Sequence, residues 1–446
     1  MAWKGSASGR KALLGLLMCG ALSILWASYI ALHASSGAGA FKGFYYGARC
    51  LIEHRDPYSP STLQQVYAAE GGSFPADAAD ARFFQSAMLV YVNLPTPLFL
   101  LAPLAMLPWR MAAVAWMALN AAGLVGAALL MWRVAGEIAL KPATLLICLL
   151  LANTEIVLAL GNLAALAVSL CVIAVWCFME ERFTAAGVIC LALSLVFKPH
   201  DGGLVWLYFL LAGGVQRKRA LQSLGVAAVL ALPALLWVWA VSPHWLTEMH
   251  ENLQALSARG NVNDPGPDSL TFRSADHVIS LQALFALVRD DPRFYNLASY
   301  LTCGLLLVAG AVRAMRSRFS KENAWLALAA MAALSMLPVY HRAYDAKLLM
   351  LVVPACALLW REGGRMKWLA GVLTTLAMLS TADVTASFLL GVMNGMQGSL
   401  KSGTGRLLTA FVFHPDALVL LATGVFYLWA YFLRTGRERA EWGEQP

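Results

Sequence analysis

The sequence predicts an all-α protein that crosses a lipid bilayer many times. Apolar residues make up 60% of the 446-residue chain, and charged residues only 13%. The apolar residues gather in charge-free runs that are long enough to cross a hydrocarbon core about 30 Å thick. Because that core holds no water to hydrogen-bond the backbone, each run must be helical. The composition therefore indicates a polytopic transmembrane helical bundle.

The apolar runs define a set of candidate spans. They comprise residues 12–33, 88–108, 111–132, 142–160, 162–179, 183–198, 203–216, 220–241, 294–312, 323–339, 345–360, 368–390 and 412–433. Pro95, Pro97 and Pro103 would break or kink a helix in the run 88–108. We therefore expect that run to be re-entrant or interfacial, with 142–160 as the alternative. The remaining runs predict about 12 spans, plus or minus one.

The formal net charge of +8 is distributed as in a membrane protein rather than a nucleic-acid-binding protein. Lys and Arg cluster in short segments between apolar runs, which is typical of cytoplasmic loops. The clusters are Lys4/Arg10/Lys11, Arg217/Lys218/Arg219, Arg313/Arg316/Arg318/Lys321, Arg361/Arg365/Lys367 and Arg434/Arg437/Arg439. This pattern predicts that both termini are cytoplasmic. We expect the lipid bilayer as a partner and no nucleic acid.

On this orientation the two longest external loops are residues 34–87 and 242–293, and both are rich in Asp and Glu. Loops of this length exceed ordinary connectors and usually have a function. In the first loop, Phe41, Phe44 and Tyr45 recur at helical spacing. We therefore expect an amphipathic helix there that lies in the membrane interface.

Common cofactor and metal signatures are missing from the sequence. Seven of the eight cysteines lie inside apolar runs, where Cys behaves as a small hydrophobe. Because no Cys-x-x-Cys pair occurs, the sequence supports neither a zinc site nor a disulfide framework. No Asp-x-Asp pair occurs either, which disfavours a Mg²⁺ or Mn²⁺ site. We expect no cofactor and no bound metal.

A first polar cluster in the external loops extends from Arg49 to Tyr58. Its acid Asp56, flanked by arginines and aromatic residues, has the chemistry of a general base toward a hydroxyl group. The alternative is structural, because Asp56-Pro57 is also a common start of a turn.

A second cluster, Lys198-Pro199-His200, interrupts two apolar runs. Lys198 and His200 at such a break could bind a lipid phosphate with help from the backbone N–H groups of the next helix. The alternative is a solvated turn in which Lys198 extends its charge toward the membrane surface.

A third cluster, from Tyr340 to Lys347, occupies a short external turn. His341, Arg342 and Lys347 form a cationic group suited to a phosphate, and Asp345 could orient one of them. A salt-bridged helix end is the alternative.

Taken in order, these segments resemble glycosyltransferase family 87, the polyprenol-phosphate-mannose-dependent mannosyltransferase-like proteins of the GT-C class. The resemblance is carried by short motifs and covers most of residues 10–365. The motifs are Phe41–Arg49 followed by Asp56-Pro57-Tyr58, Tyr91–Pro97 with Pro103-Leu104-Ala105, a weak echo at Gly161-Asn162, Lys198-Pro199-His200, and the helix start with His341, Tyr344 and Asp345.

The resemblance implies a GT-C-type module over residues 1–365, followed by C-terminal helices and a short basic tail over 366–446. It further implies a bacterial inner-membrane enzyme with a periplasmic or extracellular active face. Such an enzyme would move a hexose, with mannose expected, from a polyprenyl-phosphate donor to a glycolipid or polysaccharide acceptor, inverting the anomeric carbon without a metal.

The resemblance also implies roles for individual residues. Asp56 is expected as the catalytic base, because the family's base aligns with Ala40 in this chain. The alternative is that the substitution at Ala40 alters or removes activity. The expected donor-phosphate contacts are Arg49, Lys198, His200, His341, Arg342 and Lys347, and the expected acceptor or sugar contacts are Tyr45, Tyr46, Tyr58, Tyr344 and Asp345.

Two other functions fit the same features. A lipid or sugar transporter, or flippase, would share the helix count and the intramembrane charges, although no internal repeat of the kind common in transporters is visible. A non-catalytic membrane protein of envelope assembly is the third reading.

Overall fold

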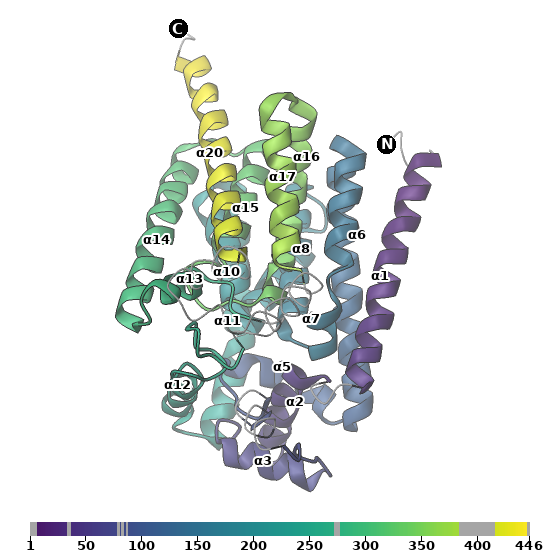
Figure 1. The fold of residues 1–446 in the computed structure, drawn as a ribbon, viewed down its shortest axis with the longest axis vertical. Coiled ribbons are helices and arrows are strands. Elements are labelled where there is room, and N and C mark those ends of the chain that lie inside the picture. The colour runs from purple at the N-terminus through teal and green to yellow at the C-terminus, as the bar shows by residue number, and fades with distance from the viewer. Residues whose placement is uncertain are drawn as a thin grey trace, which may run out of the picture.

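The computed structural model describes residues 7–33, 37–77, 81, 84–85, 88–271, 277–382 and 415–443. Within these residues the regular secondary structure is helical (Figure 1), and the β-type pairing consists of an isolated bridge between Val278 and Arg342. The predicted all-α class is confirmed.

The described helices follow one another along the chain. They are α1 (Ala7–His33), α2 (Gly39–Ile52), α3 (Pro60–Ala69), α5 (Pro95–Ala105), α6 (Trp109–Leu151), α7 (Glu155–Leu160), α8 (Leu163–Met179), α9 (Thr184–Phe197), α10 (Pro199–Leu211), α11 (Gly214–Val241), α12 (Trp245–Leu256), α13 (Leu281–Val288), α14 (Pro292–Arg316), α15 (Lys321–Leu334), the 3₁₀ helix η1 (Ala343–Leu351), α16 (Val352–Glu362), α17 (Gly364–Ser380) and α20 (Asp416–Gly443).

Six helical segments among the described residues are long and apolar enough to cross a membrane. They lie at Ala7–His33, Trp109–Leu160, Gly214–Val241, Pro292–Arg316, Ala343–Glu362 and Asp416–Glu438. Shorter apolar helices, α5, α8 and α9, accompany them. The polytopic architecture is thus confirmed, whereas the total of about 12 spans stays a prediction. Part of the predicted span 368–390 lies outside the described residues.

Prolines divide the apolar runs. Helix α6 has non-helical backbone angles at Ala139 (φ −152°, ψ 93°), four residues after Ala135 and shortly before Pro142. Because a proline lacks an N–H and its ring clashes with the preceding turn, α6 consists of two helices, as the separate candidate spans 111–132 and 142–160 suggested. Helix α5 has only 11 residues, about 17 Å, which is too short to cross the core.

The two ends of the molecule are formed by different parts of the chain. The start of α1 and the end of α20 lie at the same end of the bundle, whereas α2, α3 and α12 gather at the opposite end (Figure 1). Because α2 and α3 come from loop 34–87 and α12 from loop 242–293, helices from both predicted external loops lie at one end.

Helix α2 is the amphipathic helix expected in the first loop, but protein covers most of it. It packs on α5 and α3. The Phe41 ring stacks on Trp116 at a centroid distance of 5.2 Å, and Phe41, Tyr45 and Tyr46 are buried. The apolar face of α2 therefore contributes to a second core rather than resting on lipid.

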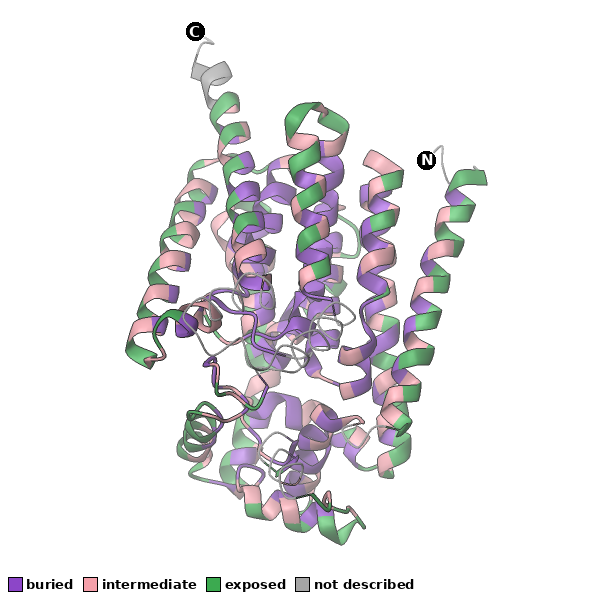
Figure 2. Ribbon diagram, in the orientation of Figure 1, coloured by how far each residue is buried: buried purple, intermediate pink, exposed green. Residues whose placement is uncertain are grey.

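Buried residues concentrate in the middle of the bundle, where α8, α15, η1 and α16 pack together (Figure 2). The surrounding helices α1, α11 and α14 expose large apolar side chains; for example, Val229 and Leu305 are each 71% exposed. Soluble proteins rarely expose apolar surface on this scale. These outer faces are the surface that lipid chains would cover.

We predict that Gly161→Ala destabilises the protein. Gly161 has φ +65°, and an added Cβ would lie 2.9 Å from Phe41 Cβ. Its carbonyl also accepts a hydrogen bond of 2.8 Å from Trp116 Nε1. Strain and the clash together should cost about 1–3 kcal/mol, measured as a lower Tm in detergent. Gly126→Ala is the control, because its Cβ meets nothing within 4 Å; an equal Tm for both variants would contradict the expectation.

Candidate active site

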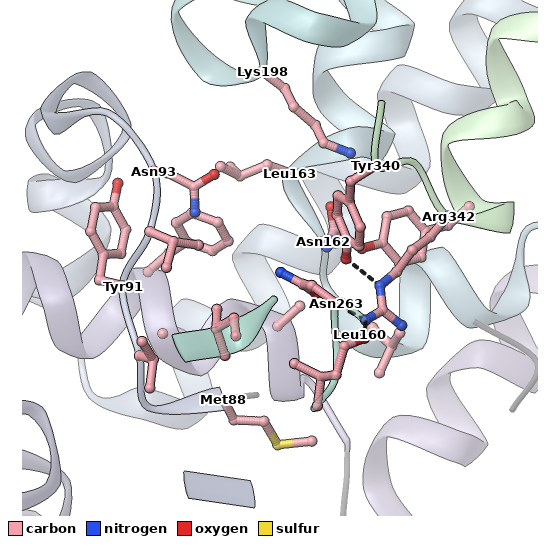
Figure 3. Close-up of a pocket in the computed structure, with 18 of the residues that line it drawn as sticks. Met88, Tyr91, Asn93, Leu160, Asn162, Leu163, Lys198, Asn263, Tyr340 and Arg342 are labelled. Carbon is pink, nitrogen blue, oxygen red and sulfur yellow. Dashed lines mark hydrogen bonds between the residues drawn. The ribbon is translucent and has the colours of Figure 1, made fainter. Parts of the chain in front are cut away.

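A cavity of about 410 Å³ is lined by α1, α2, α7, α8 and the residues around Lys198, Asn263 and Arg342. Figure 3 shows its polar side chains, with Lys198, Tyr340 and Arg342 on one side and Tyr91 and Asn93 on the other. The apolar walls come from α1, α2, α7 and α8, and from the stretch after residue 87. The wall residues on these segments are Ile30, Ala40, Gly43, Phe44, Met88, Val90, Ile156, Ala159, Leu160 and Leu163.

Lys198 reaches the cavity because the helix breaks at this residue. A residue before proline is sterically excluded from the helical region, and Lys198 has φ −152° and ψ 83°. Helix α9 therefore ends at Phe197, and α10 begins at Pro199. The break that the sequence indicated is present and places Lys198 and His200 on the cavity wall.

Lys198 is held by two buried carboxylates. Its ammonium contacts Asp345 on η1 and lies 3.5 Å from Asp201 on α10. It also lies 5.2 Å from the centre of the Tyr344 ring. Both aspartates are almost fully buried. Because a buried carboxylate without a partner is costly, this arrangement fixes α10 to the start of η1.

The segment that carries Arg342 is fixed by backbone bonds. The Arg342 N–H donates to Asp345 Oδ2 at 2.9 Å and caps η1. The N–H of Ile279 donates to the His341 carbonyl at 2.9 Å, beside the bridge from Val278 to Arg342. The second external loop therefore fixes the turn at its cavity end.

Among the described residues, three oxygen atoms help to orient the Arg342 guanidinium. It donates to the Val262 carbonyl at 2.7 Å and to Asn263 Oδ1 at 3.3 Å, and it also contacts the Tyr340 hydroxyl. Asn263 and Tyr340 line the cavity as well. The sequence analysis did not identify Asn263, because a single Asn in a polar loop carries no motif.

A further group of side chains lies at the cavity wall, with His200 on the lining and Asp201 and His341 behind it. His200, Asp201 and His341 bring their ligand atoms within 4.8 Å of one another. The two imidazole rings have centroids 4.9 Å apart. This is an arrangement that could hold a metal ion, although the sequence predicted none.

The structure places the first predicted cluster apart from the cavity lining. Asp56 Oδ1 accepts a 2.8 Å hydrogen bond from the Tyr58 N–H, which is the turn geometry that the structural alternative described. The Tyr58 hydroxyl donates to the Asn93 carbonyl at 2.8 Å. Burial raises the pKa of the nearby Glu248 carboxyl, and Asp56 raises it further. Neither Asp56 nor Tyr58 is among the residues that line the cavity.

Arg49, Tyr45 and Tyr46 also point elsewhere. Arg49 Nε lies 2.9 Å from Glu70 and 3.5 Å from Glu53. The Tyr45 hydroxyl donates to the Leu107 carbonyl at 2.8 Å. The Tyr46 ring stacks on Trp109. These residues join α2 to α3 and to the start of α6 and do not line the cavity.

The third cluster divides between the cavity and the bundle core. Tyr340, Arg342 and Tyr344 line the cavity. Asp345 and His341 lie behind the wall, where they contact Lys198 and face Asp201. Lys347 is buried on η1 and is not a lining residue. The cavity thus unites Lys198, His200, Arg342 and Tyr344 from the predicted set.

We predict that Lys198→Met destabilises the protein by about 3–5 kcal/mol, because it leaves two buried carboxylates without their cation. Adding Asp345→Asn should recover part of that loss in a double-mutant cycle measured by thermal unfolding. The exposed pair Lys321–Glu180, 3.4 Å apart, provides the control, since Lys321→Met should cost less than about 1 kcal/mol. A cycle without coupling between Lys198 and Asp345 would show that the two residues do not form a buried ion pair.

The comparisons with known proteins agree with this architecture. The model of glycosyltransferase family 87 matches residues 91–340, which is more than half of the chain. The match includes Lys198, His200, Asn263 and Tyr340 but neither α2 nor Arg342. No curated protein and no solved structure matches the chain. The chain belongs to glycosyltransferase family 87, and with its apolar helices it is a membrane glycosyltransferase.

Proposed function

We propose that the protein transfers a hexose, with mannose as the expected sugar, from a polyprenyl-phosphate donor to a glycolipid or polysaccharide acceptor of the envelope. The observation that carries the proposal is the cavity, which combines apolar walls with two basic side chains, Lys198 and Arg342. A lipid-linked phosphate sugar has the same division between an apolar chain and an anionic head.

The apolar side of the cavity suits the first isoprene units of the donor. Ile30 on α1, Ile156 and Leu160 on α7 and Leu163 on α8 form this side. Helix α1 lies at the edge of the bundle (Figure 1) and exposes apolar side chains along its length. A lipid chain could therefore enter past α1 without leaving an apolar environment.

The basic side suits the phosphate leaving group. Arg342 is the stronger candidate, because its guanidinium is already oriented by Val262 and Asn263 and guanidinium groups suit phosphate. Lys198 lies at the same wall, where Asp201 and Asp345 share its ammonium. Donors fixed in advance stabilise a developing negative charge without the cost of reorganisation, so inverting displacement needs no metal in contact with the phosphate.

The base that deprotonates the acceptor is the open part of this proposal. No Asp or Glu occurs among the described residues that line the cavity. Ala40, at the position that aligns with the family's base, does line it, near the start of α2. Transfer by this chain should accordingly be slow, since a positioned general base contributes about 10²–10⁴-fold.

The orientation in the membrane forms part of the same proposal. We assign the end with α2, α3 and α12 to the periplasmic or extracellular side of a bacterial inner membrane and both termini to the cytoplasm. The basic loops between the apolar runs support this assignment, as does the location of α2, α3 and α12 from the two long loops at one end (Figure 1).

The donor proposal is tested by sugar transfer in proteoliposomes that contain a polyprenyl-phosphate sugar. Arg342→Gln should lower the transfer rate by about 10²–10³-fold. Arg49→Gln should change it only a few-fold, because Arg49 pairs with Glu70 away from the cavity. Equal loss in both variants would favour the broader phosphate site that the sequence predicted, and movement of donor across the bilayer without transfer would favour a flippase.

Ala40→Asp tests the position of the missing base. A carboxylate near the start of α2 is compatible with the helix dipole, and we expect it to raise the transfer rate. Asp56→Asn keeps the acceptor oxygen for the Tyr58 N–H and should leave the rate nearly unchanged. Loss of transfer in Asp56→Asn together with no gain in Ala40→Asp would instead establish Asp56 as the base.

A further inference from the structure

His200, Asp201 and His341 present acceptor or donor atoms that find no hydrogen-bond partner. His200 Nε2, His341 Nε2 and both carboxylate oxygens of Asp201 are buried and make no hydrogen bond, and Asp201 Oδ2 lies 3.5 Å from the Lys198 ammonium. Asp201 is 2% exposed and His341 1% exposed. Buried polar atoms almost always have partners, so unpartnered atoms on three neighbouring side chains require an explanation.

The distances show that these atoms face one another. His341 Nε2 lies 3.6 Å from Asp201 Oδ1, and His200 Nε2 lies 3.9 Å from the same oxygen. Ligand atoms of a tetrahedral zinc ion lie about 3.3 Å apart when each bond is about 2.0 Å long. Small side-chain rotations would therefore bring all three into coordination.

The tautomer of His341 points to a cation at this place. His341 Nδ1 lies 3.2 Å from the Val339 carbonyl, which can only accept, so Nδ1 carries the proton. In the neutral ring, Nε2 then offers a lone pair toward a carboxylate oxygen. Two facing acceptors repel each other unless a cation, or a proton on the carboxylate, lies between them. A ring N–H that donates to a backbone carbonyl is also the usual support of a metal-bound histidine.

The charge of the surroundings favours a cation as well. Asp201 and Asp345 share the single ammonium of Lys198. With neutral imidazoles, these three charged groups leave one excess negative charge in a buried place. A bound phosphate would add to that excess, whereas a divalent cation reverses it.

We propose that His200, Asp201 and His341 form a binding site for a zinc ion. Two imidazole nitrogens and one carboxylate suit Zn²⁺ better than Mg²⁺ or Ca²⁺, which prefer oxygen ligands. The ion would join the start of α10 to the turn before η1, and its fourth ligand would be water. The ligand atoms themselves are closed to solvent, so the ion would act on the structure of the cavity wall, which His200 helps to line.

The zinc site does not depend on the proposed donor or acceptor, and binding of the metal alone tests it. The full-length protein, purified without a polyhistidine tag, is stripped with EDTA, loaded with Zn²⁺, freed of excess and assayed by elemental analysis. We expect about one Zn²⁺ per chain. His341→Asn and Asp201→Asn should each weaken binding by at least about tenfold, whereas the exposed His250, changed to Gln, should not.

Two further measurements make the outcome decisive. In the wild type, Co²⁺ in place of Zn²⁺ should give the intense visible absorption of a tetrahedral site. This measurement does not depend on how well any variant folds. EDTA should lower the Tm of the wild type but not that of Asp201→Asn. A wild type that retains no metal, or that retains as much as His341→Asn, would overturn the proposal and leave a proton, rather than a metal ion, between His341 and Asp201.

Discussion

The ion pair between Lys198 and Asp345 joins the two helix interruptions on which the site depends. One interruption is the break at Pro199, and the other is the 3₁₀ start of η1 after the turn at residues 339–342. Buried ion pairs add little stability compared with apolar packing, but removal of one partner is costly. The pair therefore acts mainly as a constraint on geometry. It permits one registration of α10 against η1, and that registration brings Arg342 and Lys198 to the same wall.

Irregular backbone borders the cavity at three places. The turn between α7 and α8 has Gly161 in a left-handed conformation, with Asn162 on the cavity and its side chain capping α8. The other two places are the break at Lys198 and the bridge at Arg342. In a membrane, non-helical backbone is tolerated only where protein buries it or where it lines a polar cavity. The interruptions and the cavity thus require each other, which is why apolar helices alone could not build this site.

The sequence identified those parts of the site whose chemistry conflicts with their surroundings. Lys198 and Arg342 are conspicuous because charges are rare inside or between apolar runs. The fold class, the break at Lys198 and the proline-divided helices followed from similarly local rules. Arg49 and Asp56 carried no such conflict. They lie in a loop that is polar throughout, and the structure shows them paired within that loop, with Glu70 and with the Tyr58 N–H.

Other features depended on geometry that spacing does not reveal. Asp345 and Lys347 are two residues apart on η1 and point in different directions, and Asp345 is the one that meets Lys198. Asn263 reaches Arg342 across 79 residues of chain. The group of His200, Asp201 and His341 likewise unites residues from two distant segments. A search for metal motifs within one segment could not find it.

The charge balance behind the wall links the metal site to the chemistry of the cavity. While Asp201 and Asp345 share the Lys198 ammonium, little of that positive charge acts on a phosphate in the cavity. Zinc bound to Asp201 neutralises one of the two carboxylates and leaves Lys198 opposite Asp345 alone. The wall then carries a net positive charge together with Arg342, although the ion never contacts the donor. The field of a buried ion in a low-dielectric interior acts beyond the ion's own ligands. The proposed zinc ion could therefore help to stabilise the proposed phosphate leaving group without taking part in the reaction.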